Sequence, residues 1–244
     1  MALREKPYSQ FMDYLAHAET GEDGGERLPS LNDLSKELGI SVSRLREQME
    51  VARALGLVEV RPRTGMRRLP YEFLPGIKQS LFYALSLDRS YFESFADLRK
   101  HIEEAYWFQA VEQLQPEDLE ELGSLVSRAW KKLHGSPVQI PQDEHRQLHL
   151  LIYRRLNNPF VLGILEAYWD AYEAVGLNVY ADYAYLEKVW EYHQAMVEAI
   201  RRKDFQAGYQ ALADHTDLIY HRPDGKTVLS NELTNHQPAE PESY

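Results

Sequence analysis

Residues 26–69 read ERLPSLNDLSKELGISVSRLREQMEVARALGLVEVRPRTGMRRL, and this stretch decides the fold of the first part of the chain. Ser30 can cap a short helix, and Gly39 ends that helix and lets the chain turn sharply. Between them lies an apolar stripe at helical spacing, made of Leu31, Leu34 and Leu38. The pattern predicts a first helix followed by a tight turn.

A second helix follows the glycine turn, with Ser41 or Ser43 as its cap. Its inner stripe is formed by Leu45, Met49, Ala52 and Leu55. The chain then becomes LVEVRP, which is typical of a short strand, and the turn at residues 63–65 brings it back as a second strand. Two helices joined by a tight turn and followed by a two-stranded ribbon predict a winged helix-turn-helix.

The charge of the same stretch favours a DNA-binding surface. Residues 41–69 hold seven arginines and three glutamates, a net charge of +4, in a chain whose net charge is −11. An arginine-rich segment within an acidic protein is typical of phosphate binding. The alternative is that the two helices and the hairpin pack as a small module that binds no nucleic acid.

These residues resemble the DNA-binding domain of the GntR family of bacterial transcription regulators over about residues 4–69. The resemblance rests on the pattern LPS…LSKELGIS…LREQ…GLVEVRP…G. It implies a recognition helix and a wing that contact DNA, and the corresponding positions here are Ser41, Ser43, Arg44, Arg46, Arg63, Thr64 and Gly65.

Three positions depart from the pattern of that family. Asn32 and Val42 stand where the family usually has arginine, and Arg44 stands where it often has proline or threonine. Because arginines pair bidentately with guanine, these differences change which bases are read. The resemblance therefore predicts a regulator but no operator sequence.

The composition excludes several other classes of protein. The chain has no cysteine, so it forms no disulfide, thiolate metal site or cysteine nucleophile. It contains no apolar run near the roughly 20 residues that span a membrane and no signal-peptide core, so we expect a cytoplasmic protein without membrane contact. Residues 1–70 hold 11 basic and 11 acidic residues, and the acidic excess lies beyond them. We therefore expect the second part of the chain to bind something other than nucleic acid.

The predicted fold class is mainly α, with a winged helix-turn-helix in residues 1–70 and an antiparallel helical bundle in residues 77–222. The segment 70–76 carries two prolines and a glycine and is the expected linker, whereas residues 223–244 are expected to be a flexible tail. A first amphipathic helix is expected at 4–20. The helices expected in the bundle are 77–87, 90–114, 117–134, 142–157, 159–175, 181–203 and 205–221.

Four histidines lie on apolar faces of three of these helices. His145 and His149 are four residues apart, a spacing that offers two imidazoles to one metal ion. His193 and His215 each fall on the inner stripe of a later helix. A single inward histidine is commonly a hydrogen-bonded core residue, but four on facing helices predict a shared metal site.

The second part of the chain resembles the FCD ligand-sensing domain of the FadR subfamily of GntR regulators. The resemblance rests on LRKHIE (98–103), HRQLHLLIYRRLNNP (145–159) and YHQAMVEAIRRKD…H (192–215). In metal-binding members one aspartate and three histidines hold a divalent cation; His149, His193 and His215 match the three histidines, and His145 stands at the aspartate position. If His145 also binds the metal, a site of four imidazoles favours zinc, nickel, cobalt or copper over magnesium or calcium. The alternative is a site that has lost its metal and holds a ligand directly.

The resemblance also implies an effector-binding role for Arg99 and Asn158. A buried arginine can grip a carboxylate through two parallel hydrogen bonds, which suggests a small carboxylate effector. Arg99 could instead pair with Glu103 one turn on, and Asn158 could instead cap the helix that starts at Pro159.

Taken together, these patterns predict a homodimeric regulator, a repressor by family habit, that binds double-stranded operator DNA. A carboxylate entering near a histidine-bound metal would shift the placement of the two DNA-binding domains. One alternative is a metal-dependent hydrolase or oxygenase, against which no general base is evident. Another is an architectural DNA-binding protein with a metal-free bundle.

Overall fold

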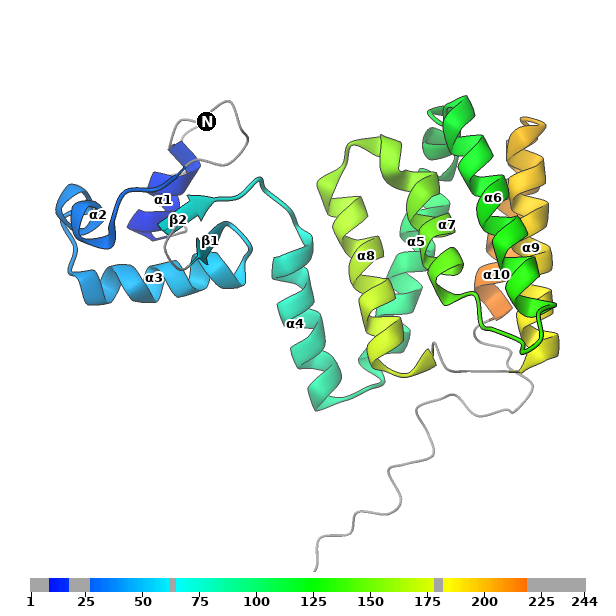
Figure 1. Ribbon diagram of the computed structural model, residues 1–244, viewed down its shortest axis with the longest axis horizontal. Helices are drawn as coiled ribbons and strands as arrows, with labels where there is room; N and C mark the ends of the chain where they lie inside the picture. Colours follow the sequence, from blue (N-terminus) through cyan, green and yellow to red (C-terminus); the bar gives the residue numbers. More distant parts are fainter. Residues whose placement is uncertain (1–8, 18–26, 62–64, 178–181, 219–244) are drawn as a thin grey trace, which may run out of the picture. The chain divides into compact units, whose positions relative to one another are not determined.

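The computed structural model describes residues 9–17, 27–61, 65–177 and 182–218, and these form ten α-helices, one 3-10 helix and one two-stranded sheet (Figure 1). The predicted fold class, a winged helix-turn-helix followed by an all-helical domain, is confirmed. The chain divides into two compact units, residues 1–81 and 82–244. Predicted features at 63–64 and 223–244 lie outside the described residues.

The N-terminal unit has the helix-turn-helix that the sequence predicts. Its helices are α1 (Gln10–His17), α2 (Leu31–Leu38) and α3 (Val42–Ala54). The hydroxyl of Ser30 accepts from the amide of Asp33 at the start of α2, and Gly39 ends that helix in the left-handed conformation at φ 65°. Of the two serines considered as caps for the second helix, Ser41 fills the position.

The wing is an antiparallel pair of β1 (Val58–Arg61) and β2 (Gly65–Arg68). Val58 opposes Arg68 and Val60 opposes Met66. Val58 and Met66 are buried with the apolar stripes of the three helices, so the ribbon is fixed to the same core as α3. The core of this unit is made of Phe11, Leu15, Leu28, Leu34, Ile40, Leu45, Met49, Ala52, Val58 and Met66.

The helix expected at 77–87 begins earlier than predicted. It is α4 (Leu74–Leu87), so the last three residues of the expected linker at 70–76 are helical. Pro75 occupies the first turn of α4, where its missing amide hydrogen leaves no hydrogen bond unmade. The proline and glycine that suggested a linker are therefore part of a helix start.

The remaining helices belong to the C-terminal unit and follow the predicted pattern. They are α5 (Tyr91–Glu112), α6 (Pro116–Leu133), α7 (Gln142–Tyr153), α8 (Pro159–Ala174), α9 (Tyr183–Arg201) and α10 (Phe205–Asp217), with the 3-10 helix Arg154–Leu156 after α7. The helix expected at 142–157 is thus shorter, because Asn157 takes a left-handed conformation at φ 50° just before Pro159 starts the next helix.

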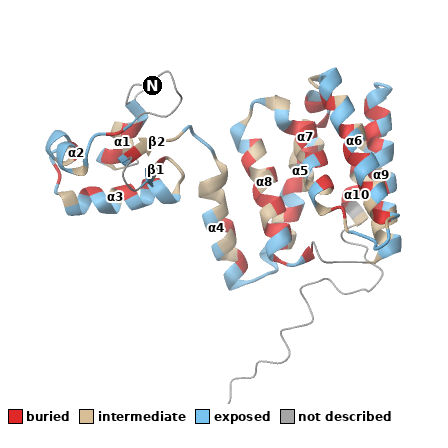
Figure 2. Ribbon diagram, viewed as in Figure 1, coloured by how far each residue is buried: buried red, intermediate tan, exposed pale blue. Residues whose placement is uncertain are grey.

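The bundle packs α6 between α7 and α9, and α10 against both α5 and α9. Buried residues, coloured red on the ribbon in Figure 2, occur along all of these helices and form one core. Trp107, Trp190 and Tyr153 are among the fully buried side chains of this core. No helix within the described residues is both long enough and apolar enough to cross a membrane.

Candidate functional site

The second helix of the helix-turn-helix, α3, exposes several of the residues predicted to contact DNA. Ser41, Ser43, Arg44 and Arg46 are exposed, and the hydroxyl of Ser41 also accepts from the amide of Arg44 and so caps the helix. Gly65 begins β2 with φ 85°, a conformation that favours glycine. The wing residues Arg63 and Thr64 lie outside the described residues.

The arginines of this unit differ in how far their charge is compensated. Arg53 pairs with Glu50, at 2.8 Å between Nη1 and Oε1, and Arg61 pairs with Glu59, at 2.9 Å between Nε and Oε2. Within the described residues, Arg44 and Arg46 have no ion-pair partner. The uncompensated positive charge of α3 therefore lies in its first half, the half that recognition helices present to base edges.

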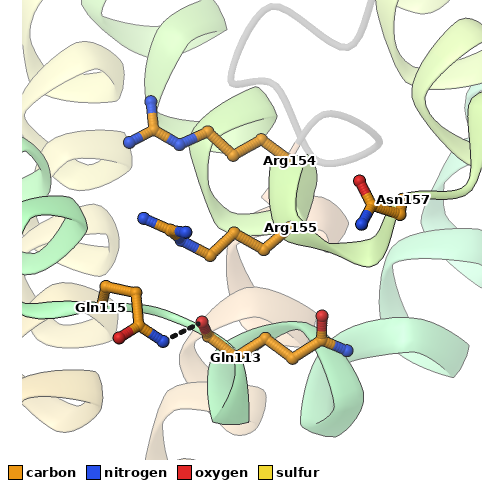
Figure 3. Close-up of a pocket in the computed structure, with 5 residues that line it drawn as sticks. All are labelled: Gln113, Gln115, Arg154, Arg155 and Asn157. Carbon is orange, nitrogen blue, oxygen red and sulfur yellow. Dashed lines mark hydrogen bonds between the residues drawn. The ribbon is translucent and has the colours of Figure 1, made fainter.

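A polar pocket of about 550 Å³ lies in the C-terminal unit, lined by Gln113, Gln115, Arg154, Arg155 and Asn157 (Figure 3). Its two guanidinium groups suggest an anion site. However, both bind Asp118, and Arg154 also binds Glu121 at 3.1 Å. The two positive charges are matched by two carboxylates, so the pocket offers no net charge to an anion.

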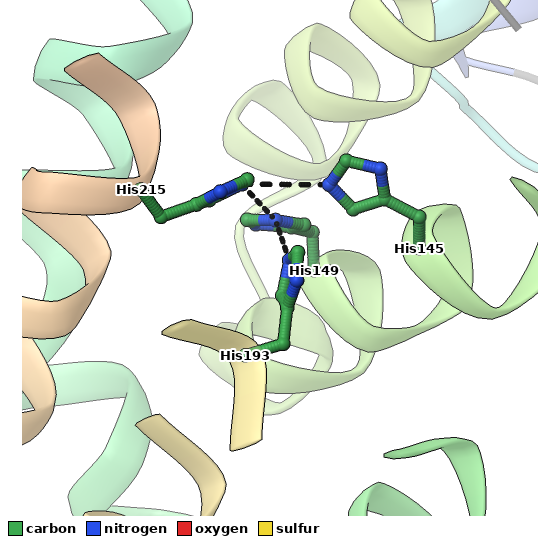
Figure 4. A group of neighbouring side chains, drawn as sticks. All are labelled: His145, His149, His193 and His215. Carbon is green, nitrogen blue, oxygen red and sulfur yellow. Dashed lines mark hydrogen bonds between the residues drawn. The ribbon is translucent and has the colours of Figure 1, made fainter. Parts of the chain in front are cut away.

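The four predicted histidines come together inside the bundle (Figure 4). His145 and His149 project from successive turns of α7, His193 from α9, and His215 from the last turn of α10. The Nε2 atom of His149 lies 3.1 Å from that of His193 and 3.3 Å from that of His215. The Nε2 atoms of His145 and His215 are 3.4 Å apart.

These separations fit a metal ion. Four nitrogens arranged tetrahedrally at 2.0–2.1 Å from a zinc ion are about 3.3–3.4 Å apart. The three pairs of Nε2 atoms given above lie within 0.3 Å of that separation, and one ligand atom from each of the four side chains falls within 4.8 Å of every other. The four side chains therefore form a group that could hold one divalent cation.

The electrostatics keep the imidazoles neutral, which is the form that binds metal. Burial lowers the pKa of His145, His193 and His215 well below the ordinary value, and the neighbouring histidines lower each pKa further. Burial also lowers the pKa of His149, although Glu103 opposes that effect. A neutral imidazole keeps one ring nitrogen with a free lone pair, so each of the four rings can offer a donor atom to a metal ion at neutral pH.

A buried carboxylate orients one of these rings. Glu103 on α5 places Oε1 3.0 Å from Nδ1 of His149, and both side chains are fully buried. When Nδ1 donates its proton to the carboxylate, the lone pair of Nε2 faces the other three histidines. Burial alone would raise the pKa of Glu103, but Arg99 and His149 outweigh it and lower that pKa, so the carboxylate is ionised.

Arg99 lies at the cluster, as predicted for an effector-binding residue, but its charge is already compensated. Its Nε atom is 2.8 Å from Oε2 of Glu103, the pairing that the sequence left as the alternative. Its Nη2 atom is 2.9 Å from Nδ1 of His149, and its guanidinium lies 4.7 Å from the ring centre of Tyr168. Arg99 therefore joins Glu103 and His149 in one buried group.

Asn158 has the role of a helix cap. Its Oδ1 atom accepts hydrogen bonds from the amides of Phe160 and Val161 at the start of α8. This is the alternative that the sequence offered for Asn158. Its effector-binding role stays a prediction.

Two features of the cluster were not expected from the sequence. The link between Glu103 and His149 joins residues 46 positions apart, and only the spacing of four between Arg99 and Glu103 hinted at a buried role for Glu103. Trp169 is the other: its ring centre is 4.6 Å from that of His145, and its indole nitrogen has no hydrogen-bond partner within the described residues. In the sequence, a tryptophan on an apolar helix face looks like any other core residue, so the contact between Trp169 and His145 could not be predicted.

Comparisons with known proteins give a family match and several similar structures. Residues 94–218 match the FCD domain family. The structure resembles that of GntR from Streptococcus agalactiae, with a TM-score of 0.62, 18% identity, and coverage of 81% of this chain and 90% of that chain. McbR/YncC from E. coli matches with a TM-score of 0.47, 22% identity, and coverage of 81% and 86%. Comparison with curated proteins gives no significant match.

Proposed function

This chain belongs to the FCD domain family and is a DNA-binding regulator of the GntR type, and we propose that a divalent metal ion held by four histidines in its helical domain controls DNA binding. The family assignment supports a sensing role for the histidine cluster rather than a catalytic one. In this proposal residues 1–70 read DNA and residues 77–222 sense the signal. Membership of the FadR subfamily stays a prediction.

The observation that carries the proposal is the convergence of His145, His149, His193 and His215 from three helices. Four neutral imidazoles are a donor set suited to zinc or nickel, and poorly suited to magnesium or calcium, which prefer oxygen. Such an ion, when bound, supplies a fixed positive charge and a cross-link between helices. Glu103 supports the site by orienting His149.

The proposed target is double-stranded operator DNA with two-fold symmetry. A homodimer would present two copies of α3 to successive major grooves, with half-sites about 34–36 Å apart. The uncompensated charges of Arg44 and Arg46 support this role for α3. The assignment as a repressor, which rests on the habit of the family, is part of the same proposal.

A small carboxylate effector is the second candidate ligand. Its support is the position of Arg99, whose Nη2 atom lies 2.9 Å from His149 and therefore beside the proposed metal. A carboxylate would have to compete there with Glu103, which already engages the guanidinium. The carboxylate would act by binding one placement of the DNA-binding domains better than the other.

Metal analysis of the purified full chain tests the metal site. We expect close to one equivalent of a transition metal per chain, and a large loss of metal in His149→Ala and in His193→Ala. His101→Ala is the matched control, because His101 is exposed on α5 and its Nδ1 atom faces the carbonyl of Asp97. Full metal content in both core variants would show that the metal, if present, binds elsewhere.

A further inference from the structure

We propose that Arg27, which precedes the helix-turn-helix in the sequence, contacts DNA and binds a backbone phosphate beside the wing. The inference rests on the DNA-binding function proposed above and adds a residue outside the arginine-rich stretch 41–69. Three observations carry it: a third segment in the sheet of the wing, the direction of the Arg27 side chain, and the charge of the face on which that side chain lies.

The first observation is that residues 27 and 28 add a third segment to the wing. The backbone amide of Leu28 donates to the carbonyl of Met66 on β2 at 2.9 Å, and Arg27 forms an antiparallel bridge with Arg67. The side chain of Leu28 is buried in the same core as Met66. The backbone at Arg27 is therefore fixed along the edge of β2 that β1 does not occupy.

The second observation is the direction of the Arg27 side chain. Successive side chains of an extended segment point to opposite faces of a sheet, and residues directly opposite each other share a face. Leu28 points into the core, so Arg27 points outward on the same face as Arg67. A Cβ atom added to Gly65 would lie 3.9 Å from Nε of Arg27 and 4.0 Å from its Nη2. The guanidinium therefore lies beside the first residue of β2.

The third observation is the charge of this outer face of the wing. Glu59 opposes Arg67 in the sheet, so its carboxylate lies on the same face as Arg27. That carboxylate pairs with Arg61, at 2.9 Å between Nε and Oε2. Arg27 is exposed and has no ion-pair partner within the described residues. Three arginines and one glutamate share the face, and the charge of Arg27 is available to an anion.

A DNA phosphate is the anion that fits this position. The wing and α3 share one core, so α3 in the major groove brings the wing against the sugar-phosphate backbone that borders the groove. Arginine is a common donor to phosphate oxygens, and such contacts carry no sequence information. Because the backbone at Arg27 is already fixed to β2, this contact needs little further ordering. Arg27 therefore raises the affinity for all DNA sequences alike.

The salt dependence of DNA binding tests this role. A DNA fragment is selected from a random pool by the full chain. Fluorescence anisotropy then gives the affinities of wild type and Arg27→Ala for that fragment and for a scrambled one, over a series of salt concentrations. Each phosphate contact contributes about 0.9 to the slope of log affinity against log salt concentration. We expect Arg27→Ala to reduce the slope by about that amount and to weaken binding to both fragments by the same factor.

Two variants are the controls. Arg27→Lys keeps the positive charge and should keep the wild-type slope, because lysine also binds phosphate. Arg202→Ala removes an exposed arginine at the end of α9, in the C-terminal unit, and should leave the slope unchanged although it alters the net charge by the same amount. Circular dichroism should give the same thermal unfolding for wild type and Arg27→Ala, because the side chain of Arg27 is exposed.

Three results would overturn the inference. They are a wild-type slope in Arg27→Ala, an equal change of slope in Arg202→Ala, and a loss of affinity restricted to the selected fragment, which would indicate a base contact. In each of these cases the wild-type chain still binds DNA. A wild-type chain that binds no fragment from the pool would instead refute the proposed function and the role of Arg27 with it, so the two failures are distinguishable.

Discussion

At the scale of single residues, Glu103 is a carboxylate buried between two partners. It is fully buried, it accepts from His149, and it compensates the charge of Arg99. A buried ion pair adds little stability compared with an apolar pair of the same shape, but loss of one partner leaves the other charge uncompensated. Loss of Glu103 should therefore cost more folding free energy than loss of the neighbouring Glu104, which is partly exposed.

Replacing Glu103 by glutamine should therefore destabilise the helical domain by about 3–5 kcal/mol, because Arg99 stays charged without a partner. The measurement is urea unfolding followed by tryptophan fluorescence. Glu104→Gln is the control, since Glu104 pairs with Lys100 at 4.0 Å near the surface and its loss should cost less than about 1 kcal/mol. Equal effects of the two variants would mean that Glu103 has no special role.

Arg46 is the residue on which DNA binding is best tested. It is exposed on α3 and has no ion-pair partner within the described residues. Arg46→Ala should weaken binding to selected DNA by about tenfold or more, since one good contact is worth about 1–3 kcal/mol. The assay is a fluorescence anisotropy titration at fixed salt.

Arg53→Ala serves as the control for Arg46, because Arg53 lies on the same helix and is already paired with Glu50. We expect a smaller loss of affinity in this variant, with thermal unfolding of both proteins unchanged. Wild-type affinity in Arg46→Ala would remove this residue from the DNA-contacting surface.

At the scale of elements, the start of α6 depends on one acidic side chain. Asp118 accepts from the backbone amide of Gln115, which completes a capping box, and it also binds Arg154 and Arg155 from the 3-10 helix. Burial opposes ionisation, but Arg155, the Gln115 amide and Arg154 lower the pKa of Asp118 to about 2. One residue therefore joins the start of α6 to the end of α7.

This arrangement predicts a dependence of stability on acid. The pKa of Asp118 is lower in the folded state than the ordinary value of 3.8, so its stabilisation is complete above about pH 5 and is lost as the pH falls toward 2. We expect a contribution of about 1 kcal/mol, because the two arginines are partly exposed and solvent screens them. Urea unfolding of wild type and Asp118→Asn between pH 6 and 3 measures it. A constant difference in unfolding free energy across that range would contradict the prediction.

At the scale of the whole molecule, the chain has two compact units, and the proposed function assigns DNA binding to the first and sensing to the second. All four tryptophans, Trp107, Trp130, Trp169 and Trp190, lie in the C-terminal unit together with the histidine cluster. Tryptophan fluorescence therefore reports unfolding of the sensor domain and not of the winged helix-turn-helix. This separation makes the effect of metal on one unit measurable in the intact chain.

Removal of metal should destabilise the sensor domain. A ligand that binds only the folded state, at a free concentration 100 times its Kd, stabilises by about 2.7 kcal/mol. We expect the fluorescence-detected transition of the full chain to fall by several degrees in EDTA and to recover with Zn²⁺ but not with Mg²⁺. The variant His149→Ala should show no such difference. An EDTA effect of wild-type size in that variant would argue against the histidine site.

Much of the architecture could be predicted from local patterns. Apolar residues at helical spacing, Ser30 and Gly39 at the ends of one helix, and the turn at Gly65 depend on neighbours a few positions away. The same periodicity placed His145 and His149 on one inward face. The predicted boundaries of α4 and α7 were less accurate. Pro75 at the start of α4 and the left-handed Asn157 after α7 each act within one helical turn, which is shorter than the windows in which apolar periodicity can be recognised.

The sequence by itself determined the helices, the winged ribbon and the inward direction of each histidine, because those properties follow from spacing along one element. Only the tertiary structure decided that α7, α9 and α10 bring four Nε2 atoms to within the reach of one ion, that Glu103 on α5 binds His149, and that it also occupies Arg99. Such contacts depend on the angles and offsets at which helices pack, and these are set by the whole core and not by any one segment.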